Sequence, residues 1–216
     1  VYSTYTTEME KLAASLQAIG CRMIFIRPSI YDQTAELDAI NHFGKNDMLG
    51  RFAAFIDQLA VRYDAEVVDF YSFMISINAR LQEKDPSATI ISPDRVHPDM
   101  AGHFVMSYAF LEAQNMPEVV SSIRINAATQ EIEALKNCSI EPTAEMSSEA
   151  LSFSCREAAL PFPIKSAQDR ALDWIPFEEK YNQQKLLVSG LESGRYELRI
   201  DGMAVGTWTA NELATG

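Results

Sequence analysis

The sequence has little positive charge and no long apolar run. Its 216 residues include 18 lysines and arginines against 30 aspartates and glutamates, which gives a net charge of −12. Nucleic acids and anionic membranes bind basic surfaces, so we expect neither as a partner. A membrane-spanning helix needs about 20 apolar residues in a row, and no such run occurs here. We therefore expect no membrane span, and no signal peptide is visible.

Cysteine is scarce as well, with Cys21, Cys138 and Cys155 the only three. An odd number leaves at least one thiol without a disulfide partner in the chain. Cys21 opens an apolar stretch, so we expect its thiol to be buried. Cys138 and Cys155 could form a disulfide if they lie on neighbouring strands. The sequence therefore does not decide the redox compartment, and it gives no indication of the oligomeric state.

The first seventy residues alternate between helix and strand patterns. Thr7 and Glu10 form a capping box that predicts a helix start, and Gly20 predicts its end. Residues 21–26 and 66–70 read as two buried strands, and residues 48–63 as a helix between them. Two parallel strands cannot form a sheet that is covered on both faces. We therefore expect further strands upstream of Val1, in a longer protein.

One stretch points to chemistry: Ser-Pro-Asp-Arg-Val-His-Pro (residues 92–98), followed by an apolar helical run at residues 101–111. Pro98 suits the first turn of a helix, which puts His97 at the helix start. The Asp94 carboxylate, three residues earlier, can accept a hydrogen bond from one ring nitrogen and leave the other facing a substrate. That pair is the acid and base of a Ser-His-Asp triad. The alternative is that both residues only cap the helix.

A metal site is the chemical rival in the same stretch. Asp94, His97, Asp99 and His103 are ligand types that zinc or another divalent ion accepts. However, six residues separate the two histidines, and the i,i+4 spacing of a zinc helix is missing. We expect a buried, structural His103 and no metal or organic cofactor.

Several motifs together resemble the SGNH (GDSL-type) esterases and lipases. The Asp-x-x-His-Pro of residues 94–98, with Gly102 and the apolar helix after it, resembles the last block of that family. Four further stretches resemble one branch of it: residues 24–32 and 67–70 as preceding strands, and residues 159–163 and 190–202 as an appended C-terminal region. The resemblance implies a serine esterase, with His97 as general base and Asp94 as its acid.

The resemblance also implies that the nucleophile lies upstream. The family carries its serine in a Gly-Asp-Ser block, and this sequence contains none. A Gly-x-Asn-Asp pattern occurs at residues 44–47, but it follows the strand that it should precede. We therefore interpret Asn46 and Asp47 as the N-cap and first turn of the next helix. Tyr31 and Asp32, which follow the first strand, are our candidates for substrate-binding residues.

After residue 117 the pattern changes to short alternating strands, at residues 122–126, 151–155 and 185–188, and a hairpin at 195–208. A helix-like stretch at residues 166–173 interrupts them. The prediction is thus α/β: residues 1–117 as part of a three-layer α/β/α parallel-sheet domain (SGNH/flavodoxin-like), and residues 118–216 as a smaller β-rich region. We expect Trp174, Phe177, Tyr196 and Trp208 to lie in the core or a groove of that region.

The predicted function is hydrolysis of a carboxylic ester on a small molecule or a glycan. Because the chain has the base and lacks the nucleophile, we expect it to be inactive by itself. The alternative is a carbohydrate-binding or accessory module, in which Trp208 contacts sugar and Asp94 and His97 are structural.

Overall fold

Two units divide the chain. The computed structural model describes the backbone of residues 1–216 and the side chains of residues 1–142 and 146–216. Unit 1 comprises Val1–Met116 and Ile164–Pro176, and unit 2 comprises Pro117–Pro163 and Phe177–Gly216. The first segment of unit 1 ends at Met116, close to residue 117, where the sequence pattern changes. The division differs from the expected one because residues 164–176, with Trp174, return to unit 1.

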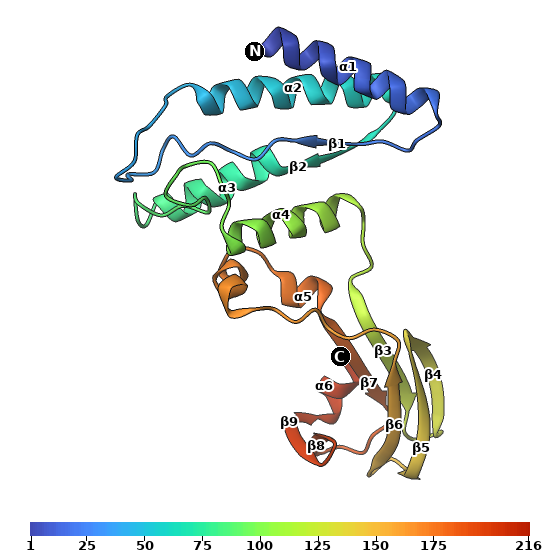
Figure 1. Cartoon of the computed structure of the whole chain (residues 1–216). Helices are drawn as coiled ribbons and strands as arrows, with labels where there is room; N and C mark the ends of the chain where they lie inside the picture. The colour runs from blue at the N-terminus through green and yellow to red at the C-terminus, as the bar shows by residue number, and fades with distance from the viewer. The chain divides into compact units, whose positions relative to one another are not determined.

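Unit 1 is built on two parallel strands, β1 (Ile24–Arg27) and β2 (Glu66–Asp69), with Phe25 opposite Val67. The helix α2 (Lys45–Tyr63) joins them in the predicted βαβ order. The helices α1 (Tyr2–Ala18) and α2 lie on one side of these strands, and α3 (Phe70–Gln82) and α4 (Met100–Ala113) on the other (Figure 1). A 3-10 helix, η1 (Ser166–Asp173), completes the unit.

Helix α1 confirms the predicted stop and corrects the predicted start. Gly20 has φ +73°, and its N–H donates to the Gln17 carbonyl, while the Cys21 N–H donates to the Leu16 carbonyl. This is the Schellman arrangement, in which a glycine ends a helix in the left-handed conformation. The prediction that Thr7 and Glu10 mark the helix start is wrong, because the helix already begins at Tyr2.

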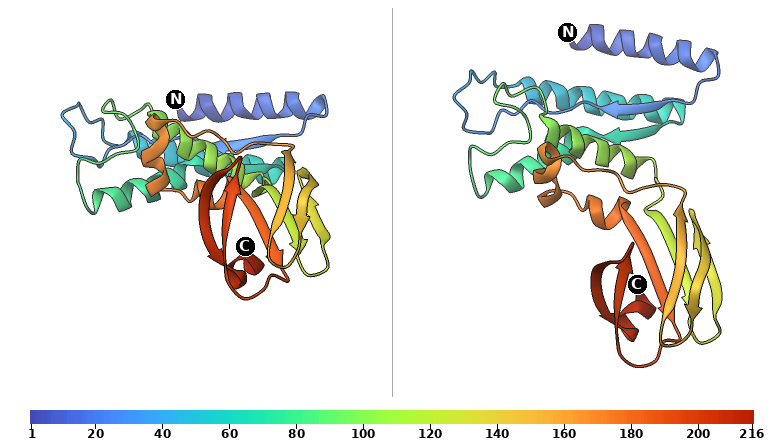
Figure 2. Two further views of the ribbon diagram at one scale, coloured as in Figure 1. Left: turned by 90° about the horizontal axis from the view of Figure 1, so that it is seen from below. Right: turned by 60° about the horizontal axis from the view of Figure 1, so that its bottom comes forward.

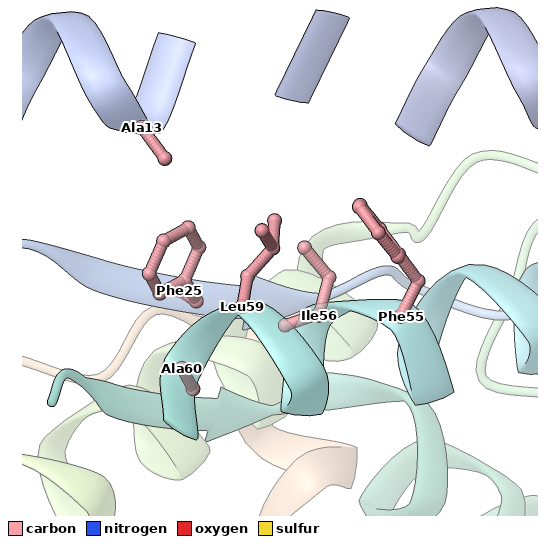
Figure 3. Packing of buried hydrophobic residues seen from close by; sticks show 6 residues of the cluster. All are labelled: Ala13, Phe25, Phe55, Ile56, Leu59 and Ala60. Atoms are coloured by element: carbon pink, nitrogen blue, oxygen red, sulfur yellow. The ribbon is translucent and has the colours of Figure 1, made fainter. Parts of the chain in front are cut away.

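The core of unit 1 lies where α2 meets α1 and β1. Side chains of α2 project toward Ala13 of α1 and pack beside Phe25 of β1 (Figure 3). They are Phe55, Ile56 and Leu59, and Ala60 of α2 belongs to the same buried cluster. The other face of β1 differs from our expectation, because Ile26 is exposed. Cys21 is exposed too, so its predicted burial is wrong.

Unit 2 holds three small sheets. The first has the order β4-β3-β7, with β3 (Val119–Asn126), β4 (Glu131–Lys136) and β7 (Gln183–Ser189). The second pairs β5 (Cys138–Met146) with β6 (Leu151–Glu157), and the third pairs β8 (Arg195–Ile200) with β9 (Met203–Thr209). Two short helices, α5 (Phe177–Tyr181) and α6 (Ala210–Thr215), belong to the same unit.

The hairpin of β8 and β9 turns at Asp201 and Gly202, as the sequence predicts, with φ +51° and +81°. Two positive φ values are typical of the tight turn that matches the twist of a hairpin. Cys138 and Cys155 do lie on neighbouring strands, β5 and β6, but both thiols are free. The structure is thus mixed α/β with several small sheets. Within the described residues, no helix is long and apolar enough to span a bilayer.

Truncating Leu59 tests this account of the core. The Leu59 side chain on α2 is fully buried in the cluster with Ala13 of α1 and Phe25 of β1, so Leu59→Ala leaves a cavity. We expect it to lower the free energy of unfolding by about 2–5 kcal/mol. Val61→Ala, at an exposed position of the same helix, is the matched control and should change it by less than about 0.5 kcal/mol. Urea denaturation gives both values, and equal losses would contradict the packing described here.

Candidate active site

Backbone hydrogen bonds close residues 92–98 into a tight loop. Ile91 and Pro98 pair as an isolated antiparallel bridge, and the Ser92 N–H donates to the His97 carbonyl at 2.7 Å. The Arg95 N–H donates to the Ser92 carbonyl at 2.9 Å. The two ends of the loop are therefore held together, and the residues between them form its turn.

The Asp94 carboxylate fastens this loop from inside. One oxygen, Oδ1, accepts from the Ser92 hydroxyl at 2.8 Å and from the N–H groups of Val96 at 2.9 Å and His97 at 3.0 Å. The other oxygen, Oδ2, lies 2.6 Å from Nδ1 of His97. Asp94 is therefore both the anchor of the turn and the partner of the imidazole.

The arrangement fixes the orientation of the His97 ring. A carboxylate only accepts hydrogen bonds, so Nδ1 carries the proton and Nε2 is left as the acceptor of the neutral ring. The His97 side chain is 79% exposed, against 50% for Asp94. Among the hydrogen bonds of the described residues, none occupies Nε2. The ring hydrogen bond from His97, followed by the backbone N–H groups and the Ser92 hydroxyl, holds the pKa of the Asp94 carboxyl well below its usual value.

Helix α4 begins two residues after Pro98, not at it. Asp99 is its N-cap, and the Asp99 carboxylate accepts from the Gly102 N–H at 2.9 Å. Pro98 belongs to the bridge with Ile91 instead, so our placement of it in the first turn is wrong. Gly102 lets the helix approach this bridge closely, because a Cβ there would lie 2.2 Å from the Ile90 carbonyl oxygen.

The four residues of the alternative metal site do not form one cluster, although Asp94 and His97 lie together. The Asp99 carboxylate accepts from the Gly102 N–H and forms an ion pair with Arg170 of η1, so both of its oxygens already have partners in the protein. His103 lies on the exposed side of α4, so our expectation of a buried histidine is wrong. In the part of the chain that the structure describes, no group of three potential ligands could hold a metal ion.

Tyr31 and Asp32 are placed inside the loop between β1 and α2. Tyr31 is 4% exposed; its hydroxyl accepts from the His42 N–H at 2.8 Å, and its own N–H donates to Oδ1 of Asn46. Asp32 is 1% exposed, and Asn78 of α3 donates to its Oδ2 at 2.7 Å. These contacts favour a structural role for both residues, so the substrate contact stays a prediction without support from their positions.

The Asp32 carboxyl keeps its charge in spite of its burial. Burial raises the pKa of this group, but hydrogen bonds from Thr89, Ala35, Asn78 and Thr34 outweigh it, so the pKa lies below its ordinary value. A carboxylate with this many donors is satisfied by the protein itself. Its function in the structure is to hold the loop.

The Gly-x-Asn-Asp pattern at residues 44–47 belongs to the start of α2, as we interpreted it. The detail differs, because Gly44 is the N-cap, with φ +88°, and Asn46 lies in the first turn. The Asn46 side chain accepts from the Tyr31 N–H at 3.1 Å, and the Asn46 backbone carbonyl accepts from the Tyr71 hydroxyl at 2.9 Å. The amide of Asn46 therefore fixes a loop.

Arg95 is a functional candidate that sequence reasoning missed. It lies between Asp94 and His97, has φ +70°, and is only 3% exposed. Its backbone carbonyl accepts from the Asp32 N–H at 2.9 Å. The sequence offers a single signal for it, a charged residue in the turn of the Asp-x-x-His motif, and that signal does not distinguish a buried arginine from a solvated one.

The aromatic residues proposed for the β-rich region do not form an exposed row. Phe177 is buried, and Tyr196 and Trp208 are half-buried partners on β8 and β9. The Trp208 ring covers Gly206 of its own strand. Trp174, in unit 1, is half-buried as well. These positions favour packing, as we expected, over a sugar-binding surface.

Comparison with known proteins gives one extensive similarity. No protein-family model matches the sequence, and no curated protein matches it. Among solved structures, the chain is similar to a gut microbial diltiazem-metabolizing enzyme, with 32% sequence identity and a TM-score of 0.81. The match covers 99% of this chain and 51% of that chain, so this chain spans about half the length of that enzyme.

Two weaker similarities involve about half of this chain. An acetylxylan esterase from Geobacillus stearothermophilus has 20% identity and a TM-score of 0.42, over 52% of this chain and 47% of that chain. An alpha/beta hydrolase enzyme from the metagenome of Lake Arreo, Spain, has 23% identity and a TM-score of 0.42, over 53% of this chain and 48% of that chain. The chain as a whole is thus similar in structure to an enzyme.

Adding a methyl group at Gly102 tests the close packing at the start of α4. Gly102→Ala pushes a Cβ against the Ile90 carbonyl and Pro98, so we expect a loss of about 1–3 kcal/mol of unfolding free energy. Ser107→Ala, on the exposed side of the same helix, is the control and should cost less than about 0.5 kcal/mol. Chemical denaturation measures both, and a neutral Gly102→Ala would contradict the close contact.

The pKa of Asp94 tests the loop itself. In a carboxyl-carbon NMR titration, we expect His97→Ala to raise the Asp94 pKa toward its ordinary value, because the largest stabilising partner of the carboxylate is gone. Ser92→Ala should raise it less. Because the folded-state pKa is lowered, stability from this group is full above about pH 4 and is lost as pH falls through the folded pKa. An Asp94 pKa that His97→Ala leaves unchanged would contradict the paired geometry.

Proposed function

We propose that this chain is the C-terminal portion of an SGNH-type serine esterase, in which His97 is the general base and Asp94 its orienting acid. The observation that carries the proposal is the 2.6 Å contact between Oδ2 of Asp94 and Nδ1 of His97, on a ring whose side chain is 79% exposed. A helix cap does not need this contact, because the actual N-cap of α4 is Asp99. Nε2 of His97 is therefore left to act on a group that lies outside these 216 residues.

The proposed chemistry follows from the two ring nitrogens. Nε2 of His97 takes the proton of a serine hydroxyl from the upstream part of the protein, and the serine oxygen attacks the ester carbonyl. Asp94, across Nδ1, stabilises the imidazolium that forms. His97 then gives the proton to the leaving alcohol, which departs and leaves an acyl-enzyme. Water, activated by the same nitrogen, releases the acid and restores the serine.

The upstream part would also complete the fold. In the described residues β1 pairs only with β2, and Ile26 is exposed on this small sheet. Further parallel strands beside β1 would extend the sheet into a three-layer α/β/α domain, of which unit 1 is the C-terminal part. The half-length match to a longer enzyme supports this proposal.

The substrate class that we propose is a carboxylic ester of a small molecule or a glycan. The similarity to a diltiazem-metabolizing enzyme favours a small molecule. The net charge of −12 disfavours a polyanionic substrate. No metal or organic cofactor has a part in the mechanism that we propose.

Ester hydrolysis by this chain and by the longer protein tests the proposal. With p-nitrophenyl acetate and diltiazem as substrates, we expect no turnover by the 216-residue chain and measurable turnover by the protein with its upstream part. In the longer protein, Asp94→Asn should lower kcat by roughly 10⁴-fold, because the imidazole loses its correct tautomer. His97→Ala should abolish turnover.

His103→Ala is the matched control, because it removes an exposed histidine from the neighbouring helix α4. It should leave kcat unchanged. Turnover by this chain alone that disappears in His97→Ala would contradict the upstream nucleophile. Turnover by the longer protein that survives His97→Ala would contradict the role of His97.

A further inference from the structure

A buried arginine lies in the middle of the Asp94–His97 loop. Arg95 is 3% exposed, whereas its neighbours Asp94 and Val96 are exposed. A buried charge is costly unless hydrogen bonds satisfy it, so the partners of this guanidinium show what it holds. They are not carboxylates. The hydrogen bonds from Arg95 within the described residues all go to backbone carbonyl groups.

These carbonyl groups belong to one segment of the loop between β1 and α2. Nη1 of Arg95 donates to the Asp32 carbonyl at 3.0 Å and to the Ala35 carbonyl at 2.9 Å. Nη2 donates to the Leu37 carbonyl at 3.1 Å, and both Nη2 and Nε lie 3.3 Å from the Ala39 carbonyl. One planar group thus joins four carbonyl groups over residues 32–39. We call these residues the carbonyl platform.

The carbonyl platform is itself fixed to the body of unit 1. The Asp32 carboxylate accepts from the Asn78 side chain of α3 at 2.7 Å and from the Ala35 N–H at 2.9 Å. Oδ1 of Asn78 in turn accepts from the Ile90 N–H at 2.9 Å. The loops at residues 28–44 and 83–99 lie at the same end of unit 1 in each view (Figure 1; Figure 2). Arg95 therefore connects its loop to a rigid support.

The backbone conformation of Arg95 explains how one turn can face both ways. Its φ of +70° is a left-handed value that glycine or asparagine adopts more easily than arginine. At this value the Arg95 side chain enters the protein while Asp94 and His97 remain at the surface. The contacts with the carbonyl platform compensate for the unfavourable conformation.

We propose that Arg95 is a positioning residue, whose guanidinium holds the Asp94–His97 loop on the carbonyl platform and so keeps the imidazole in its productive orientation. This inference rests on the proposed function, because orientation matters to a reaction only if His97 is its base. A lysine could not replace Arg95, since one ammonium group cannot reach four carbonyl groups in a plane.

The experiment uses NMR of the 216-residue chain, where no turnover is needed. In the unsubstituted chain, the ring nitrogen shifts should report a proton on Nδ1 of His97, and the Asp94 pKa should lie below its ordinary value. Arg95→Gly accepts the positive φ without strain but removes the guanidinium. We expect the neutral ring to become a mixture of tautomers and the Asp94 pKa to rise. Arg95→Lys should have the same effect.

Ile56→Val is the control for lost stability, because Ile56 is buried in the core between α1 and α2. It should lower the melting temperature and leave the tautomer and the Asp94 pKa unchanged. Arg95→Gly with an unaltered tautomer and pKa would overturn the proposal, since the backbone alone would then fix the loop. If Arg95→Gly does not fold, Arg95→Gln is measured by the same criterion.

Turnover by the longer protein separates this inference from the proposed function. We expect Arg95→Gly to lower kcat about 10²-fold, the cost of a misplaced catalytic group, with KM nearly unchanged. A KM effect alone would contradict positioning. If no esterase activity depends on His97, the proposed function fails, whereas the NMR result still decides whether Arg95 orients the pair.

Discussion

The geometry of the candidate site depends on one carboxylate. Asp94 accepts four hydrogen bonds within a turn of seven residues, three at Oδ1 and one from the His97 ring at Oδ2. Because one oxygen shapes the backbone and the other holds the imidazole, the loop cannot relax without releasing the ring. A general base needs this property, since its proton must leave from one nitrogen in a fixed direction. The same hydrogen bonds favour the charged form of Asp94, which is the form that stabilises an imidazolium.

Unit 1 supports this loop from two sides. Toward the protein, Arg95 joins it to residues 32–39, and Asp32 and Asn78 join those residues to α3. Toward α4, Gly102 allows the helix to pack against the Ile90 carbonyl, and Asp99 caps the helix. A surface pair of aspartate and histidine would ordinarily be mobile and weakly coupled. Here the backbone on both sides of the pair is held by buried groups, which is how a rigid scaffold positions catalytic side chains on a loop.

Local patterns predicted much of the fold and the central pair of the site. The βαβ order, the glycine stop of α1 and the hairpin at Asp201 and Gly202 each follow from a few neighbouring residues. Strand β4 was missed because its alternation of charged and apolar residues is short: it covers Glu131–Ala134, and Leu135 breaks it. Contacts between distant segments were also out of reach. Asp32 and Arg95 are buried by contacts between segments that lie 56 to 63 positions apart in the sequence. No local pattern predicts such a contact.

The most direct test of the central claim is a crystal structure of the longer protein after reaction with a fluorophosphonate, which forms a covalent bond to an activated serine. Our account predicts a phosphonylated serine upstream of Val1, with its Oγ within hydrogen-bond distance of Nε2 of His97 and with the contact between Asp94 and Nδ1 retained. A serine modified away from His97, or a protein that does not react, would contradict the assignment of His97 and Asp94 as the base and acid of an esterase.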